Sequence, residues 1–161
     1  MSEMAEIEEN AVQKPEDVNS EKYLIFSILD RLYSFPSRQV GEIALFDTVY
    51  PLPLLPSCVL GVINRYSVPY ALFDIGLLLY KTPGKRKKVL VLKEEIDRIA
   101  FLIDDITGIV DLPEGTLLSI ERSTESNDIT EAVSASFSRD GGDVFVLDIH
   151  KIIERITEEL V

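Results

Sequence analysis

Residues 52–74 read LPLLPSCVLGVINRYSVPYALFD, and the rest of the chain is organised around them. Pro53 and Pro56 fix φ and lack the amide hydrogen, so this segment must begin as an extended or turning chain. Two apolar runs rich in β-branched residues follow, separated by the polar residues 64–67. The pattern predicts two strands around a polar interruption, which either contacts a partner or forms an ordinary surface turn.

The same strand pattern recurs along most of the chain. We expect a first hairpin over residues 23–35, an extended segment at residues 40–44, and two strands around the charged turn at residues 93–98. A further hairpin should join residues 133–137 to residues 144–147. Many short strands with frequent turns are typical of an all-β barrel or sandwich.

The end of the chain has a helical period instead. Asp148 is available as the N-cap residue. The apolar residues that follow helical spacing are Ile149, Ile152, Ile153, Ile156 and Leu160. This spacing predicts a C-terminal amphipathic helix whose apolar face belongs to the core.

The composition is that of a compact intracellular domain. A hydrophobic content of 46% in 161 residues is ample for one core. The only cysteine, Cys58, has no disulfide partner in the chain, which favours a reducing compartment and a buried structural thiol. Residues 1–20 are acidic and poor in apolar pairs, which predicts a disordered tail and no signal peptide. Since no apolar run is long enough to cross a bilayer, we expect a cytoplasmic protein.

Charge and side-chain chemistry exclude several classes of function. A net charge of −12 opposes phosphate binding, so nucleic acid is not expected as a partner. The basic residues 85–88 lack the glycine-rich frame of a phosphate loop and fit a solvated loop. The only histidine, His150, accompanies no nucleophile motif, and no His or Cys spacing fits a transition metal. We therefore expect no enzyme, no cofactor and no metal, and place the function in binding.

Several segments, taken together in order and spacing, resemble a known family. The motifs that carry the resemblance are a V-x-E-I step at Val40, Glu42 and Ile43, the proline and Gly-Val-Ile-Asn segment at residues 52–64, an L-V-D-x-V-like segment at residues 101–109, and an L-L-D-L-like strand at residues 144–149. They resemble the CheW-type chemotaxis coupling proteins over residues 22–156. The resemblance implies two small five-stranded SH3-like barrels that share a hydrophobic core over residues 21–161, with the terminal helix added.

The resemblance also implies an adaptor that does no chemistry. One surface would bind the regulatory domain of a CheA-like histidine kinase, and another would bind the cytoplasmic helical hairpin tip of a chemoreceptor. The receptor-binding positions that it implies are Val40, Glu42, Ile43, Asn64, Arg65, Tyr66 and Ile106. The apolar members Val40, Ile43 and Ile106 would serve equally well in the core, so Glu42 is the better functional candidate.

The sequence departs from the family pattern where receptor contact is implied. The family's Asn-Leu-Arg-Gly is replaced by Asn64-Arg65-Tyr66-Ser67, so Tyr66 takes the place of the arginine and Arg65 comes one residue early. On a strand, this offset would turn the guanidinium to the opposite face, whereas a turn would tolerate it. We therefore expect receptor binding to be altered more than kinase binding.

Three functions remain open from the sequence. The first is the coupling adaptor, serving either chemotaxis or a surface-motility pathway. The second is a regulator or competitor of the same fold that binds kinase without coupling to a receptor. The third is a small-molecule-binding barrel, which its ligand would stabilise by mass action without any protein partner.

Overall fold

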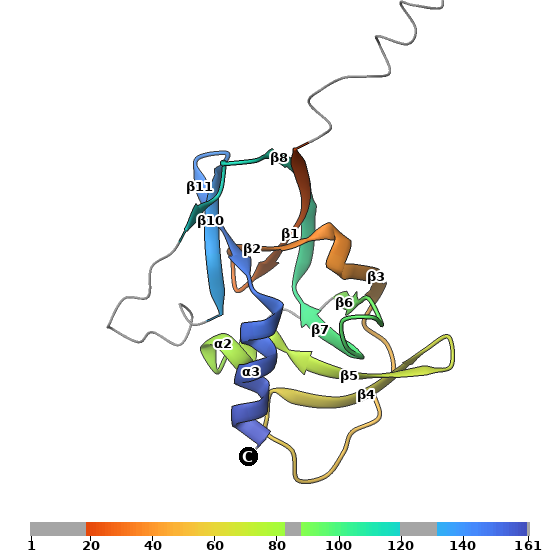
Figure 1. Cartoon of the computed structure of the whole chain (residues 1–161). Helices are drawn as coiled ribbons and strands as arrows, with labels where there is room; N and C mark the ends of the chain where they lie inside the picture. The colour runs from red at the N-terminus through yellow and green to blue at the C-terminus, as the bar shows by residue number, and fades with distance from the viewer. Residues whose placement is uncertain (1–18, 83–87, 120–131, 161) are drawn as a thin grey trace, which may run out of the picture.

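The computed structural model describes residues 19–82, 88–119 and 132–160, which form two β-sheets (Figure 1). In sheet order, the six-stranded sheet contains β8 (Asp105–Pro113), β1 (Ser20–Ile28), β2 (Arg31–Pro36), β11 (Gly142–Leu147), β10 (Val133–Arg139) and β9 (Leu118–Ser119). The five-stranded sheet contains β3 (Val40–Leu45), β6 (Lys88–Leu92), β7 (Ile99–Ile103), β5 (Val68–Asp74) and β4 (Val59–Arg65). The described helices are η2 (Ser37–Gln39), α2 (Ile75–Tyr80) and α3 (Ile149–Leu160).

The all-β architecture predicted from the sequence is confirmed. The six-stranded sheet has one strand more than the five expected for each barrel. The additional strand is β9, which pairs with β10 only at Ala135 and Ser136. Two residues carry no readable alternation, so the sequence pattern could not predict this strand. The predicted hairpins β1–β2 and β10–β11 and the two strands around the charged turn are present.

The polar interruption at residues 64–67 is shorter than predicted. β4 continues through Arg65, which pairs with Val68 of β5. Only Tyr66 and Ser67 form the turn, and both have positive φ, at 51° and 67°. Two left-handed residues make a turn whose twist matches that of paired strands, so the ladder persists to the last residue on each side. Asn64 and Arg65 are therefore strand residues.

Helix α2 was not predicted. It follows β5 directly, and the Asp74 carboxylate accepts a hydrogen bond from the Leu77 amide at 3.1 Å. Lys81, with φ of 56°, ends the helix. Six residues span fewer than two turns, which is too short for helical spacing to stand out in an apolar sequence.

The predicted C-terminal helix is confirmed as α3. Asp148 Oδ1 accepts hydrogen bonds from the amides of His150, at 2.9 Å, and Lys151, at 3.3 Å, as expected of an N-cap residue. Three isoleucines of α3, Ile149, Ile152 and Ile156, are buried in the largest core cluster. The expected core role of Leu160 is wrong, because its side chain is half exposed in the last turn of the helix.

Residues from both sheets build that largest core. Phe26 stacks on Phe35 with 5.5 Å between ring centroids, and Phe35 stacks on Phe101 of the five-stranded sheet at 5.8 Å. Cys58 is buried in the same cluster, as predicted for a structural thiol. Figure 1 shows α3 crossing from the six-stranded sheet toward the five-stranded one, so the helix covers a core that the two sheets share.

Two sequence predictions fall mostly outside the described residues. The predicted tail at residues 1–20 is described only from residue 19, and β1 already begins at Ser20, which pairs with Pro113. Of the basic residues 85–88, only Lys88 is described, at the start of β6. None of the helices in the described part of the chain is both long and apolar enough to cross a membrane.

Candidate partner-binding surface

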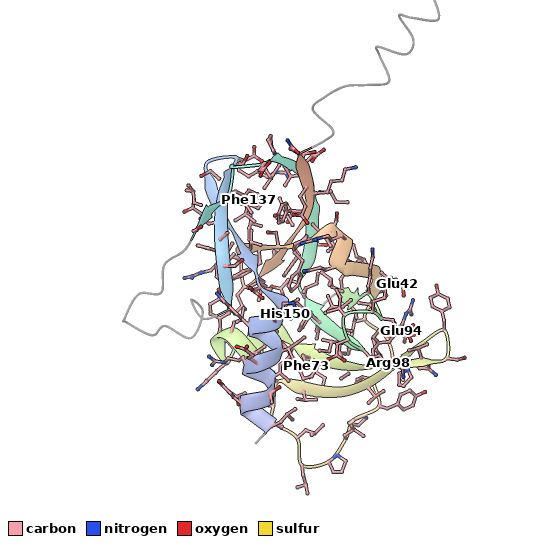
Figure 2. The ribbon with its side chains drawn as sticks, in the orientation of Figure 1. Glu42, Phe73, Glu94, Arg98, Phe137 and His150 are labelled. Carbon is pink, nitrogen blue, oxygen red and sulfur yellow. The ribbon has the colours of Figure 1, made fainter. Side chains whose placement is uncertain are left out.

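The five-stranded sheet brings two residues of the predicted receptor site together. In sheet order, β3 and β4 are the two edge strands, with three strands between them. Nevertheless, Glu42 of β3 and Arg65 of β4 form an ion pair. The sheet must therefore curl until its edges approach, as in a small barrel. Figure 2 shows Glu42 on the side of the molecule from which the β4–β5 hairpin projects.

The ion pair is bidentate. Arg65 Nε donates to Glu42 Oε2 at 3.1 Å, and Arg65 Nη2 donates to Oε1. This hydrogen bonding to Glu42 raises the pKa of the Arg65 guanidinium above its already high value, so the cation persists at every physiological pH. The side chains of Arg65 and Glu42 are 32% and 27% exposed, which leaves both within reach of a partner.

Tyr66 extends the pair to the tip of the β4–β5 hairpin. The Arg65 guanidinium carbon lies 5.4 Å from the centre of the Tyr66 ring, within the range of a cation–π contact. The ring is otherwise open to solvent, with 86% of the residue exposed. Arg65 therefore lies between a carboxylate and an exposed aromatic ring, where a partner would meet all three groups.

A bulge in β3 sets the direction of Glu42. The register between β3 and β6 shifts between Val40 and Glu42, which leaves Gly41 as the additional residue. A Cβ on Gly41 would lie 3.3 Å from the Leu92 carbonyl oxygen, so the two backbones approach closely there. After the bulge, Glu42 is half-buried, whereas Ile43 is 42% exposed on the other face of the strand.

A hollow of about 560 Å³ adjoins the ion pair. Glu42, Arg65 and Tyr66 line it together with Tyr70, residues of β6 and the turn after β6. That turn contributes Lys93, Glu94 and Glu95. The hollow combines apolar and charged groups, which suits a peptide or helix surface with both kinds of side chain.

Ile43 is exposed on β3, so its core interpretation is wrong, and the structure separates the other predicted site residues into two groups. Glu42, Arg65 and Tyr66 meet at the hollow, whereas Asn64, exposed on β4 next to Arg65 in sequence, is not among the residues that line it. Val40 and Ile106 are partly buried and pack against the shared core, so for them the core interpretation describes the observed packing.

The turn between β6 and β7 contributes to the hollow without having been predicted as part of the site. The charges of residues 93–98 predict a hairpin turn that faces water, and Lys93, Glu94 and Glu95 also line the hollow. Glu94 is also paired with Arg98, with 3.3 Å between Oε1 and Nη2, and Figure 2 shows both near Glu42. The density of charge in this run was the available signal, but only the curled sheet places it opposite the β4–β5 hairpin.

His150 and Cys58 differ in their surroundings. His150 is exposed in the first turn of α3, and burial raises the pKa of the Cys58 thiol, with the charge of Glu159 as the next contribution. A buried thiol with a raised pKa is a poor nucleophile. Within residues 19–82, 88–119 and 132–160, no three His, Cys, Asp or Glu side chains gather in a way that could hold a metal ion.

Comparisons with known proteins agree with this architecture. The family model described as the CheW-like domain matches residues 22–157. Among solved structures, the chain is similar to the scaffolding protein TtCheW from Thermoanaerobacter tengcongensis, with a TM-score of 0.73 and 16% sequence identity over 83% of this chain and 92% of that chain. A search of curated proteins found no match. The structural likeness confirms the predicted fold of SH3-like barrels.

Proposed function

The chain belongs to the CheW-like domain family, a family of non-catalytic adaptors, and we propose that it couples a chemoreceptor to a CheA-type histidine kinase. The family assignment confirms the prediction of a binding module rather than an enzyme. The finer proposal names the partners: the regulatory domain of the kinase and the helical hairpin tip of the receptor. Since that tip is cytoplasmic, the proposal places the chain in the cytoplasm.

The convergence of Glu42, Arg65 and Tyr66 beside the hollow carries this proposal. In the family resemblance, receptor contact is associated with the V-x-E-I step and with the arginine of the Asn-x-Arg-Gly turn. Here Glu42 comes from the first motif. Arg65 comes from the segment of the second, one residue before the arginine's place, which Tyr66 takes, and the side chains of Glu42 and Arg65 are in direct contact. A helical hairpin that reaches this edge of the sheet would meet both motifs at once.

The arginine retains hydrogen-bonding capacity for a partner. A guanidinium has five N–H donors, and the bidentate contact with Glu42 uses one on Nε and one on Nη2. Tyr66 also interacts with the guanidinium, and the donors that then remain, together with the exposed ring of Tyr66, could contact polar and apolar side chains of a receptor helix. We propose that Glu42 holds the guanidinium in place, which lowers the entropy lost when the receptor binds.

One observation favours the uncoupled regulator as the alternative. Glu42 already neutralises Arg65, and the bidentate geometry is the strongest that an arginine makes with a carboxylate. A receptor that needs this arginine must compete with Glu42 or accept the donors that remain. Under the alternative, the chain binds the kinase and the receptor tip does not strengthen that binding.

Isothermal titration calorimetry distinguishes the two functions. The full chain is titrated with the regulatory domain of the CheA-like kinase from the same cell, first alone and then with a receptor hairpin fragment present. Kinase binding that tightens when the fragment is added supports the adaptor. Kinase binding that ignores the fragment supports the uncoupled regulator, and absence of binding to both proteins contradicts both functions.

A matched pair of variants tests the receptor site. Arg65→Gln should weaken receptor-fragment binding by roughly tenfold, because a charge-assisted contact and the ordered Tyr66 ring are lost together. Arg38→Gln is the control, since Arg38 of η2 forms an ion pair at 2.6 Å with Glu21 of β1, which belongs to the other sheet. An equal effect of both substitutions would contradict a receptor site at Arg65.

A further inference from the structure

The turn between β6 and β7 is fixed in place beside the hollow. The Lys93 amide donates a hydrogen bond to the Gln39 carbonyl at 2.9 Å, and the Ile96 amide donates to the Lys93 carbonyl at 3.0 Å. At the other end of the turn, the Ala71 amide donates to the Arg98 carbonyl at 2.9 Å. Ile96 also packs against the core that both sheets share. The turn therefore presents its side chains in a preorganised arrangement, which lowers the entropy cost of binding.

Among the described residues that line the hollow, one carboxylate is not committed to an ion pair. The three carboxylates of the lining are those of Glu42, Glu94 and Glu95. Arg65 forms an ion pair with Glu42. Arg98 forms one with Glu94 (Figure 2). Glu95 is exposed and forms no ion pair with any residue that the structure describes, so it can accept charge-assisted hydrogen bonds from a cation on a partner.

The cations of the lining are less suited to an anionic partner. Arg65 is already neutralised by Glu42. Lys93 forms no ion pair with a described residue, but its ammonium is a strongly hydrated charge on a flexible stem and can turn toward water. The net charge of −12 on the whole chain also repels an approaching anion. The hollow therefore favours a cation over an anion.

The rest of the lining suits the stem of a long basic side chain. Tyr70, Val91 and Leu92 contribute apolar surface to the hollow. Arg65 lies over the Tyr66 ring, yet 86% of Tyr66 is exposed, which leaves room for a second cation or an apolar stem on the ring. Arginine and lysine combine an apolar stem with a charged end. Apolar surface, an aromatic ring and an available carboxylate complement both parts of such a side chain.

We propose that the hollow receives an arginine or lysine side chain of the receptor hairpin tip, with Glu95 binding its charged end and Tyr66 packing on its stem. This inference rests on the proposed adaptor function. It makes Glu95 a residue that selects among receptors, because a tip with an acidic residue at that position would bring two carboxylates together. The turn after β6 thereby reads the charge of the receptor, while Glu42 and Arg65 hold each other in place.

Calorimetric titration of the full chain with the receptor hairpin fragment from the same cell tests this inference. Glu95→Lys should weaken fragment binding by at least about tenfold, because attraction becomes repulsion. Lys93→Gln should strengthen it by roughly threefold, since a charge that repels the partner's cation is removed. Glu154→Lys is the matched control, because it changes the net charge as Glu95→Lys does, on the exposed surface of α3. It should change fragment affinity by less than about twofold.

A charge exchange then identifies the receptor residue. The basic residues of the fragment are replaced one at a time by glutamate, and each variant is titrated against the unmodified chain and against Glu95→Lys. One replacement should weaken binding to the unmodified chain and restore binding to Glu95→Lys to within about threefold of the original affinity. If no replacement does so, the assignment of Glu95 to a basic receptor residue is overturned.

The outcomes separate this inference from the proposed function. If the unmodified chain does not bind the fragment, alone or with the kinase domain present, the adaptor function fails and the inference fails with it. If the unmodified chain binds the fragment and Glu95→Lys binds it equally well, the inference alone is overturned. An equally large loss for Glu154→Lys also overturns it, since the effect then depends only on net charge. Titration with the kinase domain should show no change for Glu95→Lys, and a loss as large as that for the fragment overturns the assignment to the receptor.

Discussion

The two sheets bring their ends together in different ways. In the five-stranded sheet, Arg65 of one edge strand reaches Glu42 of the other and forms an ion pair. In the six-stranded sheet, Arg139 of β10 lies over Gly108 of the edge strand β8, with Nη2 3.7 Å from the position of a Cβ on that glycine. Both sheets therefore curl enough for an arginine to cross between strands that are distant in sheet order.

The difference lies in what each arginine meets. Arg65 meets a carboxylate, an exposed ring and a hollow. Arg139 covers a glycine, and its Nη1 is buried without a hydrogen-bond partner in the described part of the chain. Its closest carboxylate contact is Asp140, with 3.7 Å between Nε and Oδ2. Similar curvature thus produces a partly exposed charged cluster beside a hollow in one sheet and a packing contact in the other.

The largest change in stability is expected at Gly61, which the backbone of Tyr50 approaches closely. Gly61 has a φ of 141°, and a Cβ there would lie 2.2 Å from the Tyr50 carbonyl oxygen. Gly61→Ala should lower the free energy of unfolding by about 3 kcal/mol, because backbone cannot move aside as a side chain can. Gly108→Ala, which meets only the flexible end of Arg139, should change it by less than about 0.5 kcal/mol. Urea unfolding with an unchanged m-value measures both, and similar losses would contradict the comparison.

Loss of the ion pair between Glu42 and Arg65 should lower the free energy of unfolding less than Gly61→Ala does. Glu42→Gln keeps the shape of the side chain and removes its charge, so we expect a loss of about 1 kcal/mol, limited by solvent screening of groups that are roughly a third exposed. Asp140→Asn in the six-stranded sheet should have almost no effect, since Asp140 is 94% exposed and 3.7 Å from Arg139. Unfolding measured at low and high salt should show that only the Glu42 effect shrinks with salt. A salt-independent loss would mean that shape, not charge, holds the pair.

The hairpin tips allow a reciprocal exchange of residues. The β4–β5 turn has Tyr66 and Ser67 at positive φ, whereas the β10–β11 turn has Asp140 and Gly141, with φ of 51° and 81°. Ser67→Gly should raise the free energy of unfolding by about 0.5 kcal/mol, because glycine adopts this conformation without strain. Gly141→Ser should lower it by a similar amount. Thermal unfolding detects both shifts, and two changes of the same sign would refute the strain argument.

The smallest predicted effect on stability concerns Cys58, which lies in the core that both sheets share. Burial raises the pKa of the Cys58 thiol above its ordinary value. Below that value the thiol is protonated in both states, so it causes no pH dependence. As pH rises further, the unfolded chain loses the proton first, and stability falls until the folded-state pKa is passed.

Urea unfolding between pH 7 and pH 10 measures this slope. Cys58→Ser should flatten it, while Tyr23 and Tyr80, whose pKa values burial also raises, titrate in both proteins and cancel. Identical slopes in the two proteins would show that the thiol does not contribute.

The strand content was predictable because it depends on local pattern. Alternating apolar residues, turn residues such as Asp140-Gly141, and the Asp148 N-cap each act over a few positions. Helix α2 and strand β9 escaped prediction because six and two residues carry too little periodicity. The extent of β4 was also misjudged, since the polar character of Asn64 and Arg65 obscured their pairing with Pro69 and Val68.

The sequence by itself determined the family resemblance, the all-β class, the terminal helix and the candidate residues Glu42, Arg65 and Tyr66, because these follow from short-range spacing and side-chain chemistry. Only the tertiary structure decided that Glu42 and Arg65 bind each other, that the turn after β6 completes the hollow, and that Leu54 is presented to solvent. The physical reason is the curl of the five-stranded sheet: it brings together Glu42 and Arg65, which are 23 residues apart in sequence, and no local pattern records that approach.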